Sequence, residues 1–496
     1  MSLLQVDQLI VRIGDVTPVD GVSFTIEAGE TMALLGESGC GKSMTALALM
    51  RLLPAGGRIV SGQIHFDGQP LGVLSESQVR DLRGRGMAMV FQEPQTALNP
   101  VMTIGEQIAE ALPATLSKSE RQAATLQLLE EVGIPDSARR IYSYPFELSG
   151  GQKQRAMIAQ ALAGRPRLLI ADEPTTALDV SLQAQMLALI KRLAKERGMG
   201  LLLITHDLGV ARYMADKIGI MYAGQLVETF SASEEACVSH PYTRKLLDAV
   251  PSLQRTGQKL AAIPGRVPSL NQTFSGCRFA DRCDYAFADC TRQSPDWVKH
   301  SSGHAVRCHL PRKTDYPALA EPRSTLPAIQ AMAAAQTILA VEDLKVVYTQ
   351  RTGMWFGKSE LTAVDGISFQ LAAGETLALV GESGCGKTTA AKAILGLTPV
   401  SSGRVLLGGQ NVAGFPEYRF RPYRKLAQIV FQDPFSSLDP RMRVGEILTE
   451  GAAALMPGEA LDIPRLLEKV GLDPSATNRY PHEFSGGQRQ RIAIAR

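Results

Sequence analysis

The sequence has no long hydrophobic run and almost no excess of charge of one sign. No stretch approaches the ~18–20 apolar residues that a membrane-spanning helix needs, and the most apolar run, residues 198–205, has the length of a buried strand. The 496 residues include 52 Lys and Arg against 49 Asp and Glu, a net charge of +3, which does not suggest a nucleic-acid partner. The N-terminal M-S-L-L-Q-V-D has no basic stretch before an apolar segment. We therefore expect no secretion signal and a soluble, cytoplasmic protein.

Cysteine is also scarce. Two of the seven cysteines, Cys40 and Cys385, lie inside glycine-rich loops, which argues against a disulfide scaffold. Four others are separated by five, six and seventeen residues: Cys277, Cys283, Cys290 and Cys308. They include no C-x-x-C pair, so a zinc ribbon is a poor match. Four thiolates could hold zinc or an iron–sulfur cluster, or the four residues could remain free thiols.

The sequence does contain a repeat. The motif G-x-x-x-x-G-K-[ST] occurs as GESGCGKS and, 345 positions later, as GESGCGKT. In this motif backbone N–H groups surround phosphate oxygens at a helix N-terminus, the lysine approaches the β- and γ-phosphates, and the hydroxyl binds Mg²⁺. A glycine-rich turn that only opens a helix is the alternative for a single copy, and two copies make it negligible. The predicted nucleotide-binding residues are Gly36, Glu37, Ser38, Gly39, Cys40, Gly41, Lys42 and Ser43, and Gly381, Glu382, Ser383, Gly384, Cys385, Gly386, Lys387 and Thr388.

An acidic pair follows the first copy. Asp172 and Glu173 end an apolar run at 167–171, which predicts that their carboxylates emerge at the carboxyl edge of a sheet, where phosphate loops also lie. Asp172 suits Mg²⁺, and Glu173 is placed to polarise an attacking water as a general base. The alternative is an acidic helix cap.

The second copy has no matching acidic pair. Counted from the glycine motifs at 148–152 and 484–488, that pair would fall after Arg496. We expect the second unit to lack its Mg²⁺ acid, its base and its central parallel strands. Exposed apolar surface and unpaired strands would make this unit poorly stable and prone to self-association. We interpret the sequence as a fragment or a truncated product.

The fold class that the pattern predicts is α/β. Continuous apolar runs at 168–171 and 201–204 are typical of parallel strands covered on both faces, and they alternate with helical stretches such as 181–197. Antiparallel strands are expected at 4–11 and 21–26, and a helical subdomain at 93–148. The predicted domains are a first unit at 1–252, a cysteine-containing segment at 253–312, a proline- and alanine-rich linker at 313–337, and an incomplete second unit at 338–496.

The order of these motifs resembles that of the ATP-binding cassette (ABC) ATPases. In the first unit the resemblance covers the phosphate loop, Gln92 in F-Q-E-P, the L-S-G-G-Q motif at 148–152, Asp172-Glu173, Asp179 and His206. It implies that Glu173, His206 and Gln92 are catalytic, with Gln92 sensing Mg²⁺ and water and His206 contacting the γ-phosphate. The Mg²⁺ residues that it implies are Ser43, Gln92, Asp172, Thr388 and Gln432.

The resemblance also implies that two units meet head to tail. Each ATP would then lie between the phosphate loop of one unit and the signature of the other. The signature residues are Ser149, Gly150, Gly151 and Gln152, and Ser485, Gly486, Gly487 and Gln488. The family usually stacks adenine on an aromatic side chain. Tyr348 has that place in unit two, whereas unit one has Ile13 and would lose roughly 1 kcal/mol of stacking.

A narrower resemblance is to the ATPases of dipeptide, oligopeptide, nickel and glutathione importers, with both halves fused in one chain. The strings that carry it are F-Q-E-P with L-N-P, A-D-E-P-T-T-A-L-D, H-P-Y-T-R at 240–244, and F-Q-D-P with S-L-D-P. It implies ATP hydrolysis for peptide or glutathione import at the cytoplasmic face of the inner membrane. Two permease subunits and a periplasmic or surface solute-binding protein would be partners.

The importer resemblance also favours a [4Fe–4S] cluster on the four cysteines, over zinc or free thiols. No nucleic acid is expected as a partner. The alternatives are a soluble tandem ABC ATPase acting on ribosomes or nucleic acid, which would predict a basic arm, and a truncated, inactive remnant.

Overall fold

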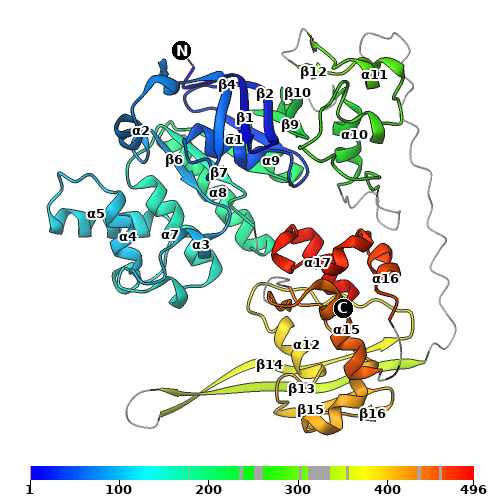
Figure 1. The fold of residues 1–496 in the computed structure, drawn as a ribbon. Helices are drawn as coiled ribbons and strands as arrows, with labels where there is room; N and C mark the ends of the chain where they lie inside the picture. The colour runs from blue at the N-terminus through cyan, green and yellow to red at the C-terminus, as the bar shows by residue number, and fades with distance from the viewer. Residues whose placement is uncertain are drawn as a thin grey trace. The chain divides into compact units, whose positions relative to one another are not determined.

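The computed structural model describes residues 2–176, 178–233, 238–250, 261–300, 304–310, 336–352, 357–432, 437–456, 458 and 461–496. The chain forms two compact units, Met1–Ile329 and Gln330–Arg496, each with one phosphate loop (Figure 1). The predicted linker lies outside the described residues except for its last two positions. None of the helices in the described ranges is long and apolar enough to cross a bilayer.

Unit one begins with an antiparallel sheet in the order β2-β1-β4-β5. Its strands are β1 (Leu4–Ile13), β2 (Val16–Ile26), β4 (Gly57–Phe66) and β5 (Gln69–Pro70). Buried and more exposed residues alternate along much of β1, as they do in a strand with one face on the core. The strands predicted at 4–11 and 21–26 are confirmed, and both are longer than predicted.

The second sheet of unit one has the order β11-β12-β10-β9-β3-β8-β7-β6. Five strands run parallel: β3 (Thr31–Leu35), β6 (Met87–Val90), β7 (Leu168–Asp172), β8 (Gly200–Thr205) and β9 (Lys217–Tyr222). Three antiparallel strands extend the sheet: β10 (Gln225–Ser231), β11 (Trp297–Lys299) and β12 (Ala305–Arg307). Because β11 and β12 belong to the cysteine-containing segment, this segment is built into unit one.

Each parallel strand is buried on both faces. In β3, Ala33 and Leu35 belong to one hydrophobic core, whereas Met32 and Leu34 belong to another on the opposite face. The same alternation holds for β8. Strands covered on both sides read as continuous apolar runs, and the predicted α/β core is confirmed.

Helices cover these faces and form a separate group at one side of unit one (Figure 1). The group contains α3 (Pro94–Ala97), α4 (Ile104–Ala111), α5 (Lys118–Glu131), α6 (Ser137–Arg140), η2 (Pro145–Glu147) and α7 (Gly150–Leu162). The other helical segments are α1 (Lys42–Leu49), η1 (Leu71–Val73), α2 (Glu76–Leu82), α8 (Val180–Glu196), α9 (Leu208–Met214), α10 (Pro241–Asp248), η5 (Ala280–Arg282) and α11 (Ala288–Arg292). Capping boxes at Thr103 and Ser117 fix the starts of α4 and α5. The helical subdomain predicted at 93–148 is confirmed.

Unit two repeats part of this design. Its sheet has the order β14-β13-β15-β16, with β13 (Thr337–Thr352), β14 (Gly357–Ala372), β15 (Ser402–Leu407) and β16 (Gln410–Asn411). Its helical segments are α12 (Lys387–Ile394), α13 (Glu417–Phe420), η7 (Arg421–Lys425), α15 (Val444–Leu455), α16 (Ile463–Lys469), η8 (Pro474–Asn478), η9 (Pro481–Glu483) and α17 (Gly486–Ala495).

Two segments of unit two that match strands of unit one are not strands. By the repeat offsets, residues 376–380 match β3 and residues 427–430 match β6, yet neither is assigned to a sheet. Their apolar side chains are open to solvent: Val380 is 89% exposed and Val430 is 53% exposed. In unit one β3 pairs with β8 and β9, and β6 pairs with β7. The described part of unit two has no counterpart of β7, β8 or β9, so these backbones lack partners.

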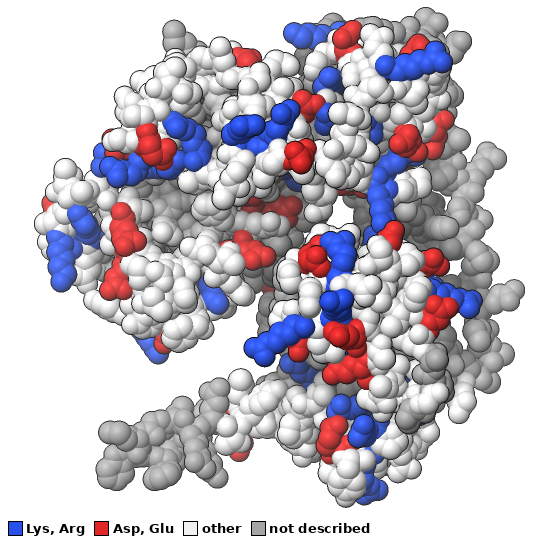
Figure 2. Space-filling view, in the orientation of Figure 1, with Lys and Arg blue, Asp and Glu red and all other residues white. Residues whose placement is uncertain are grey.

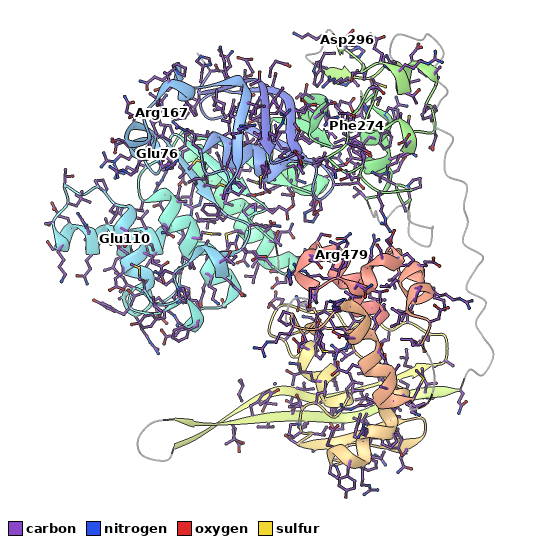
Figure 3. All side chains as sticks on the ribbon, in the orientation of Figure 1. Glu76, Glu110, Arg167, Phe274, Asp296 and Arg479 are labelled. Atoms are coloured by element: carbon purple, nitrogen blue, oxygen red, sulfur yellow. The ribbon has the colours of Figure 1, made fainter. Side chains whose placement is uncertain are left out.

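Charged side chains are intermixed on the surface. Basic and acidic residues alternate over the visible face of each unit (Figure 2). Several form exposed pairs, such as Arg83 with Glu76 at 2.8 Å near the start of α2, and Arg167 with Asp67 (Glu76 and Arg167 are labelled in Figure 3). Such pairs contribute little to stability.

Candidate active site

The first phosphate loop connects β3 to α1 and is held in shape by its own lysine. Gly41 caps α1 with φ of 105°, and a Cβ there would lie 2.0 Å from the carbonyl oxygen of Pro18. Only glycine fits such a left-handed and crowded position. Nζ of Lys42 donates to the carbonyl oxygens of Gly36 at 2.7 Å and Glu37 at 3.1 Å. The turn and the lysine of the loop are therefore held in place by contacts within the protein itself.

Cys40 fills the inside of this loop. Its side chain is fully buried, and its Sγ lies 3.7 Å from Nζ of Lys42. Burial raises the pKa of the Cys40 thiol, although the lysine charge opposes this shift. The residue therefore remains a neutral thiol, in keeping with the prediction of a small loop-filling side chain.

Asp172, at the end of β7, provides a buried carboxylate beside the loop. It is 5% exposed, and the Ser43 hydroxyl hydrogen-bonds to it. Burial raises the pKa of Asp172, and the Ser43 hydrogen bond works against that rise. Its Oδ1 has no hydrogen-bond partner among the described residues. A hydroxyl and an unsatisfied carboxylate oxygen side by side are the hard oxygen donors that Mg²⁺ prefers, so these residues fit that ion.

Glu173 lies at the centre of a second set of contacts. Its carboxylate accepts from Nε2 of Gln92 at 3.0 Å and from Oγ1 of Thr176 at 3.1 Å, and it lies 3.3 Å from Nδ1 of His206. Gln92, Glu173 and His206 follow β6, β7 and β8, which are neighbouring parallel strands. Parallel strands bring their carboxyl ends to one edge of the sheet, and this explains the convergence.

The backbone of Glu173 is strained. Its φ is 46°, in the left-handed region that a residue with a Cβ seldom adopts. The surrounding structure holds it there, because its N–H donates to the carbonyl oxygen of Ile204 at 2.9 Å. Strain of this kind is found at functional sites, where it fixes the aim of a side chain.

Electrostatics joins both sets of residues into one site. A hydrogen bond to His206 lowers the pKa of Glu173, and the same contact raises the pKa of His206. The positive charge of Lys42 also acts on Asp172, Glu173 and His206. The structure therefore brings together the predicted residues Lys42, Ser43, Gln92, Asp172, Glu173 and His206.

Comparison with known proteins agrees with this geometry. A family model described as "ABC transporter" matches residues 19–176 and 364–496. A second model, "Oligopeptide/dipeptide transporter, C-terminal region", matches residues 236–290. The chain belongs to the ABC transporter family.

The chain is also similar to named relatives and to a solved structure. Proteins called glutathione import ATP-binding protein from Shigella sonnei and Escherichia coli K12 are each 41% identical to this chain, over 97% of it and 72% of their own length. A solved dimeric ATP-binding cassette with ADP and phosphate is 26% identical, over 46% of this chain and 98% of that one, with a TM-score of 0.42.

The family assignment confirms several predictions. The tandem of P-loop ABC units and the resemblance to the dipeptide and oligopeptide transporter group are both confirmed. The protein is an ABC-type ATPase, and ABC ATPases bind ATP, typically with Mg²⁺.

Each ABC signature motif opens a helix. Ser149 caps α7 in a capping box with Gln152, and Ser485 caps α17 in the same way with Gln488. A Cβ on Gly150 or on either glycine of the second motif would meet open space, so both helix starts are accessible. Asp179 caps α8, and its Oδ1 accepts from the backbone N–H of Leu182 at 2.9 Å.

The second ABC phosphate loop has the same local geometry in a more open setting. Nζ of Lys387 donates to the carbonyl oxygens of Gly381 and Glu382, both at 2.7 Å. Gly386 has φ of 98°, but Cys385 is exposed where Cys40 is buried. Tyr348, the predicted adenine platform on β13, is 40% exposed. Thr388 and Gln432 are exposed as well.

The four cysteines of the cysteine-containing segment, Cys277, Cys283, Cys290 and Cys308, lie in one neighbourhood. The backbone N–H of Cys277 donates to the carbonyl oxygen of Cys290 at 2.7 Å. Burial raises the pKa of Cys277 to about 11 and that of Cys308 to about 12, and the nearby cysteines add to both shifts. Within the described ranges, no group of three or more His, Cys, Asp or Glu side chains could hold a metal ion. The thiols as placed therefore do not form a zinc site.

His304 is occupied elsewhere. Its Nε2 lies 2.7 Å from the buried carboxylate of Glu228 on β10. Glu228 also accepts from the backbone N–H groups of Ser239 and His240. This histidine therefore ties the cysteine segment to the sheet.

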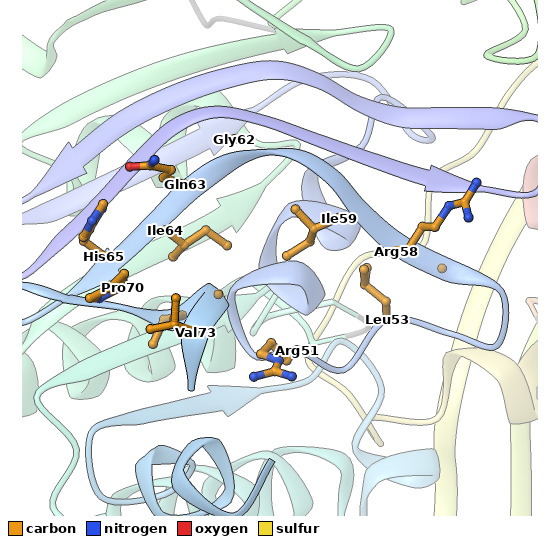
Figure 4. Close-up of a pocket in the computed structure, with 13 residues that line it drawn as sticks. Arg51, Leu53, Arg58, Ile59, Gly62, Gln63, Ile64, His65, Pro70 and Val73 are labelled. Atoms are coloured by element: carbon orange, nitrogen blue, oxygen red, sulfur yellow. The ribbon is translucent and has the colours of Figure 1, made fainter. Parts of the chain in front are cut away.

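A cavity of about 770 Å³ lies apart from these residues. It is lined by β4, β5 and η1, with Arg51, Arg58 and His65 among its polar side chains (Figure 4). None of the lining residues belongs to the phosphate loop or follows β6, β7 or β8. We therefore do not assign this cavity to the nucleotide.

The sequence reasoning missed Thr176 and Gln154. Thr176 adds a hydroxyl to the Glu173 carboxylate, and the buried Gln154 of α7 donates to the carbonyl oxygen of Pro174. Thr176 lies three residues after Glu173, a spacing that suggests a local side-chain contact. No sequence signal points to Gln154, because its partner is twenty positions away.

The Glu173–His206 pair gives a pH-dependent prediction. The raised pKa of His206 means that its charged form stabilises the pair at low pH, and this contribution is lost as the pH rises through that pKa. The lowered pKa of Glu173 means that its contribution is lost as the pH falls through the Glu173 pKa. In E173Q the pKa of His206 should fall toward its ordinary value of ~6.5, as an NMR titration of the nucleotide-free protein can measure.

D207N is the matched control for this titration. Asp207 is the smallest contributor to the His206 shift, and asparagine also caps helices well. Its effect should be smaller than that of E173Q. An equal or larger effect would mean that the Glu173 contact does not set the pKa of His206.

Proposed function

We infer that unit one binds and hydrolyses ATP to drive import of glutathione or a short peptide across a membrane. The observation that carries the inference is the convergence of Lys42, Asp172, Glu173 and His206 at the carboxyl edge of β3, β7 and β8. This edge also carries a phosphate loop at a helix N-terminus, where backbone N–H groups attract anions.

Each side chain has a role that follows from its contacts. Lys42 exchanges its two carbonyl partners for the β- and γ-phosphate oxygens. Ser43 and Asp172 hold Mg²⁺, which when bound neutralises charge on the transferred phosphate. The carboxylate of Glu173, aimed by its strained backbone, accepts the proton of an attacking water. Gln92 orients that water, and His206 contacts the γ-phosphate.

Closure of either phosphate loop by a signature motif would need both units. The first phosphate loop would be closed by Ser485, Gly486, Gly487 and Gln488, and the second, with Lys387, Thr388 and Gln432, by Ser149, Gly150, Gly151 and Gln152. Support comes from the two matched capping boxes, since each leaves a helix N-terminus with open glycines. Tyr348 would stack on adenine in the second site, and Asp179 would lie near the join.

The transported solute and the partners are inferred from the relatives. Proteins 41% identical over 97% of this chain are named for glutathione import, and residues 236–290 match an oligopeptide and dipeptide transporter segment. Two membrane permeases and a solute-binding protein would complete the transporter. The ATPase would then work at the cytoplasmic face of the inner membrane, with the helices around Gln92 facing the permeases.

We also propose that the cysteine segment binds an iron–sulfur cluster. A four-iron cluster spreads its thiolates over different irons, so it does not need the close grouping of a zinc site. The neighbourhood of the four thiols supports this assignment. The cluster would stabilise a segment that has little core of its own.

The catalytic proposal predicts a separation of binding from turnover. E173Q should bind ATP with unchanged affinity but hydrolyse it at least ~10²-fold more slowly, the scale of losing a general base. A phosphate-release assay on the full chain measures turnover. The surface variant E196Q is the control, because the partner of Glu196 among the described residues is Arg192, on the same helix α8. If E173Q turned over ATP nearly as fast as E196Q, Glu173 would not be the general base.

The transport proposal predicts ATP-dependent uptake. Vesicles that contain this protein and its two permease partners should accumulate labelled glutathione when the solute-binding protein is present. Vesicles with E173Q should not. Uptake of a dipeptide but not of glutathione would agree with the ATPase assignment, but it would show that the solute is a peptide.

The cluster proposal predicts a brown protein. Anaerobic purification should give broad visible absorption and about four irons per chain, and C277S and C283S should each abolish both signals. C40S should retain them, because Cys40 belongs to the phosphate loop. A colourless protein with one zinc per chain would show that the cysteines bind zinc and not an iron–sulfur cluster.

A further inference from the structure

Glu37, in the first phosphate loop, makes contacts that phosphate binding does not require. Its carboxylate accepts two hydrogen bonds from Arg282, from Nη1 at 2.7 Å and from Nη2 at 3.0 Å. The Arg282 side chain is 6% exposed and that of Glu37 is 29% exposed. A bidentate, charge-assisted pair of this kind is among the stronger side-chain contacts in proteins.

Arg282 is fixed from several sides. Its Nε donates to the carbonyl oxygen of Pro264 at 2.8 Å, and its Nη1 donates to the hydroxyl of Tyr222 at 3.1 Å. A Cβ on Gly265 would lie 3.3 Å from Cγ of Arg282, so the backbone packs on the side chain as well. The guanidinium therefore cannot swing away from Glu37 without breaking other bonds.

Tyr242 holds the backbone of the same loop residue. Its hydroxyl oxygen accepts from the N–H of Glu37 at 3.0 Å, and burial raises the pKa of Tyr242, so the hydroxyl stays neutral. The Tyr242 ring packs against Tyr222 and Phe279, with centroids 4.6 Å and 5.3 Å away. All three aromatic residues are almost fully buried.

A second connection runs through Arg278. It donates to Asp20 and to the carbonyl oxygen of Ala223, and its guanidinium lies 4.5 Å from the ring of Phe274 (labelled in Figure 3). Gly224 follows Ala223 in the chain, and its backbone N–H donates to the carbonyl oxygen of Cys40 in the phosphate loop at 2.9 Å. Both connections to the loop therefore start from the cysteine segment.

The two arginines lie in one short turn between two cysteines. The sequence from Cys277 to Cys283 reads C-R-F-A-D-R-C, and its backbone hydrogen bonds are continuous. The N–H of Ala280 donates to Cys277, that of Arg282 to Phe279 and that of Cys283 to Ala280. The turn places Arg282 against Glu37 of the phosphate loop. It places Arg278 against Ala223, which precedes the residue that contacts Cys40.

The charge of Glu37 is the reason that this contact matters. A carboxylate in a loop that binds a polyphosphate repels the ligand unless a cation neutralises it. The same position in unit two, Glu382, is exposed, and no described residue makes an ion pair with it. The described part of the chain places a neutralising arginine at the first phosphate loop.

We propose that Arg282 is a positioning residue of the first ATP site, which neutralises Glu37 and, with Tyr242, fixes the phosphate loop to the cysteine segment. The proposal rests on the inference that unit one binds ATP. It makes the cysteine segment a working part of the nucleotide site, in addition to any transport role. Arg282 touches none of Gln92, Glu173 and His206, so its loss should act on ATP affinity and KM rather than on kcat.

The test uses the full chain with K387A, which silences the second loop. Titration with a fluorescent ATP analogue and Mg²⁺ measures affinity at the first loop. R282Q should raise Kd about tenfold at low salt, and less at high salt, because an unpaired charge is screened. R282Q with E37Q should return to within about threefold of the parent, because both charges are then gone.

R197Q is the matched control. Arg197 makes a half-buried ion pair with Glu131, in which Nη2 lies 2.7 Å and 2.6 Å from the two carboxylate oxygens, away from the phosphate loop. R197Q should lower the melting temperature but leave the Kd unchanged. A merely structural role for Arg282 would make R282Q behave in the same way.

The outcomes separate this proposal from the general function. A parent protein that does not bind the analogue would refute ATP binding by unit one, and this proposal with it. Tight binding by the parent together with an unchanged Kd in R282Q, or a double variant as weak as R282Q, would overturn the role of Arg282 alone. If R282Q does not fold, E37Q provides the test. E37Q should bind the ATP analogue at least as tightly as the parent does, and a tenfold higher Kd would overturn the proposal.

Discussion

Parallel pairing of β6, β7, β8 and β3 is the constraint on which the rest of unit one depends. Because these strands run in one direction, their carboxyl ends lie at one edge, and the residues that follow them meet there. Gln92 and His206 are far from Glu173 in the sequence or on another strand, yet both contact its carboxylate directly. The phosphate loop joins them because β3 is the next strand in the sheet.

Unit two shows what the pairing contributes. Its phosphate loop keeps the same lysine contacts and the same left-handed glycine, so the loop geometry is local. The segments at 376–380 and 427–430, which match β3 and β6, are exposed and are not strands. The loop geometry is therefore local, whereas the contacts of Glu173 with Gln92 and His206 depend on neighbouring parallel strands.

The cysteine segment changes how the first site is understood. It adds β11 and β12 to the main sheet, and it places Arg282 on Glu37. A site described only by its motifs would end at the phosphate loop, the signature and the acidic pair. In this chain the positive charge that balances Glu37 comes from a segment about 240 residues away in sequence, and only unit one has it among the described residues.

Local motifs and apolar runs were enough to predict the phosphate loops, the parallel strands, the helical subdomain and the placement of Lys42, Ser43, Asp172 and Glu173. These follow from the sequence because glycine at a left-handed turn, a continuous buried run and a carboxylate at a strand end each have a local physical cause. Gln92 and His206 came only from the resemblance to the ABC ATPases. The Arg282–Glu37 pair, the partner of Gln154, the pairing of His304 with Glu228 and the strain at Glu173 depended on tertiary structure. Each is decided by which distant segments pack together, and no local pattern in the sequence records that choice.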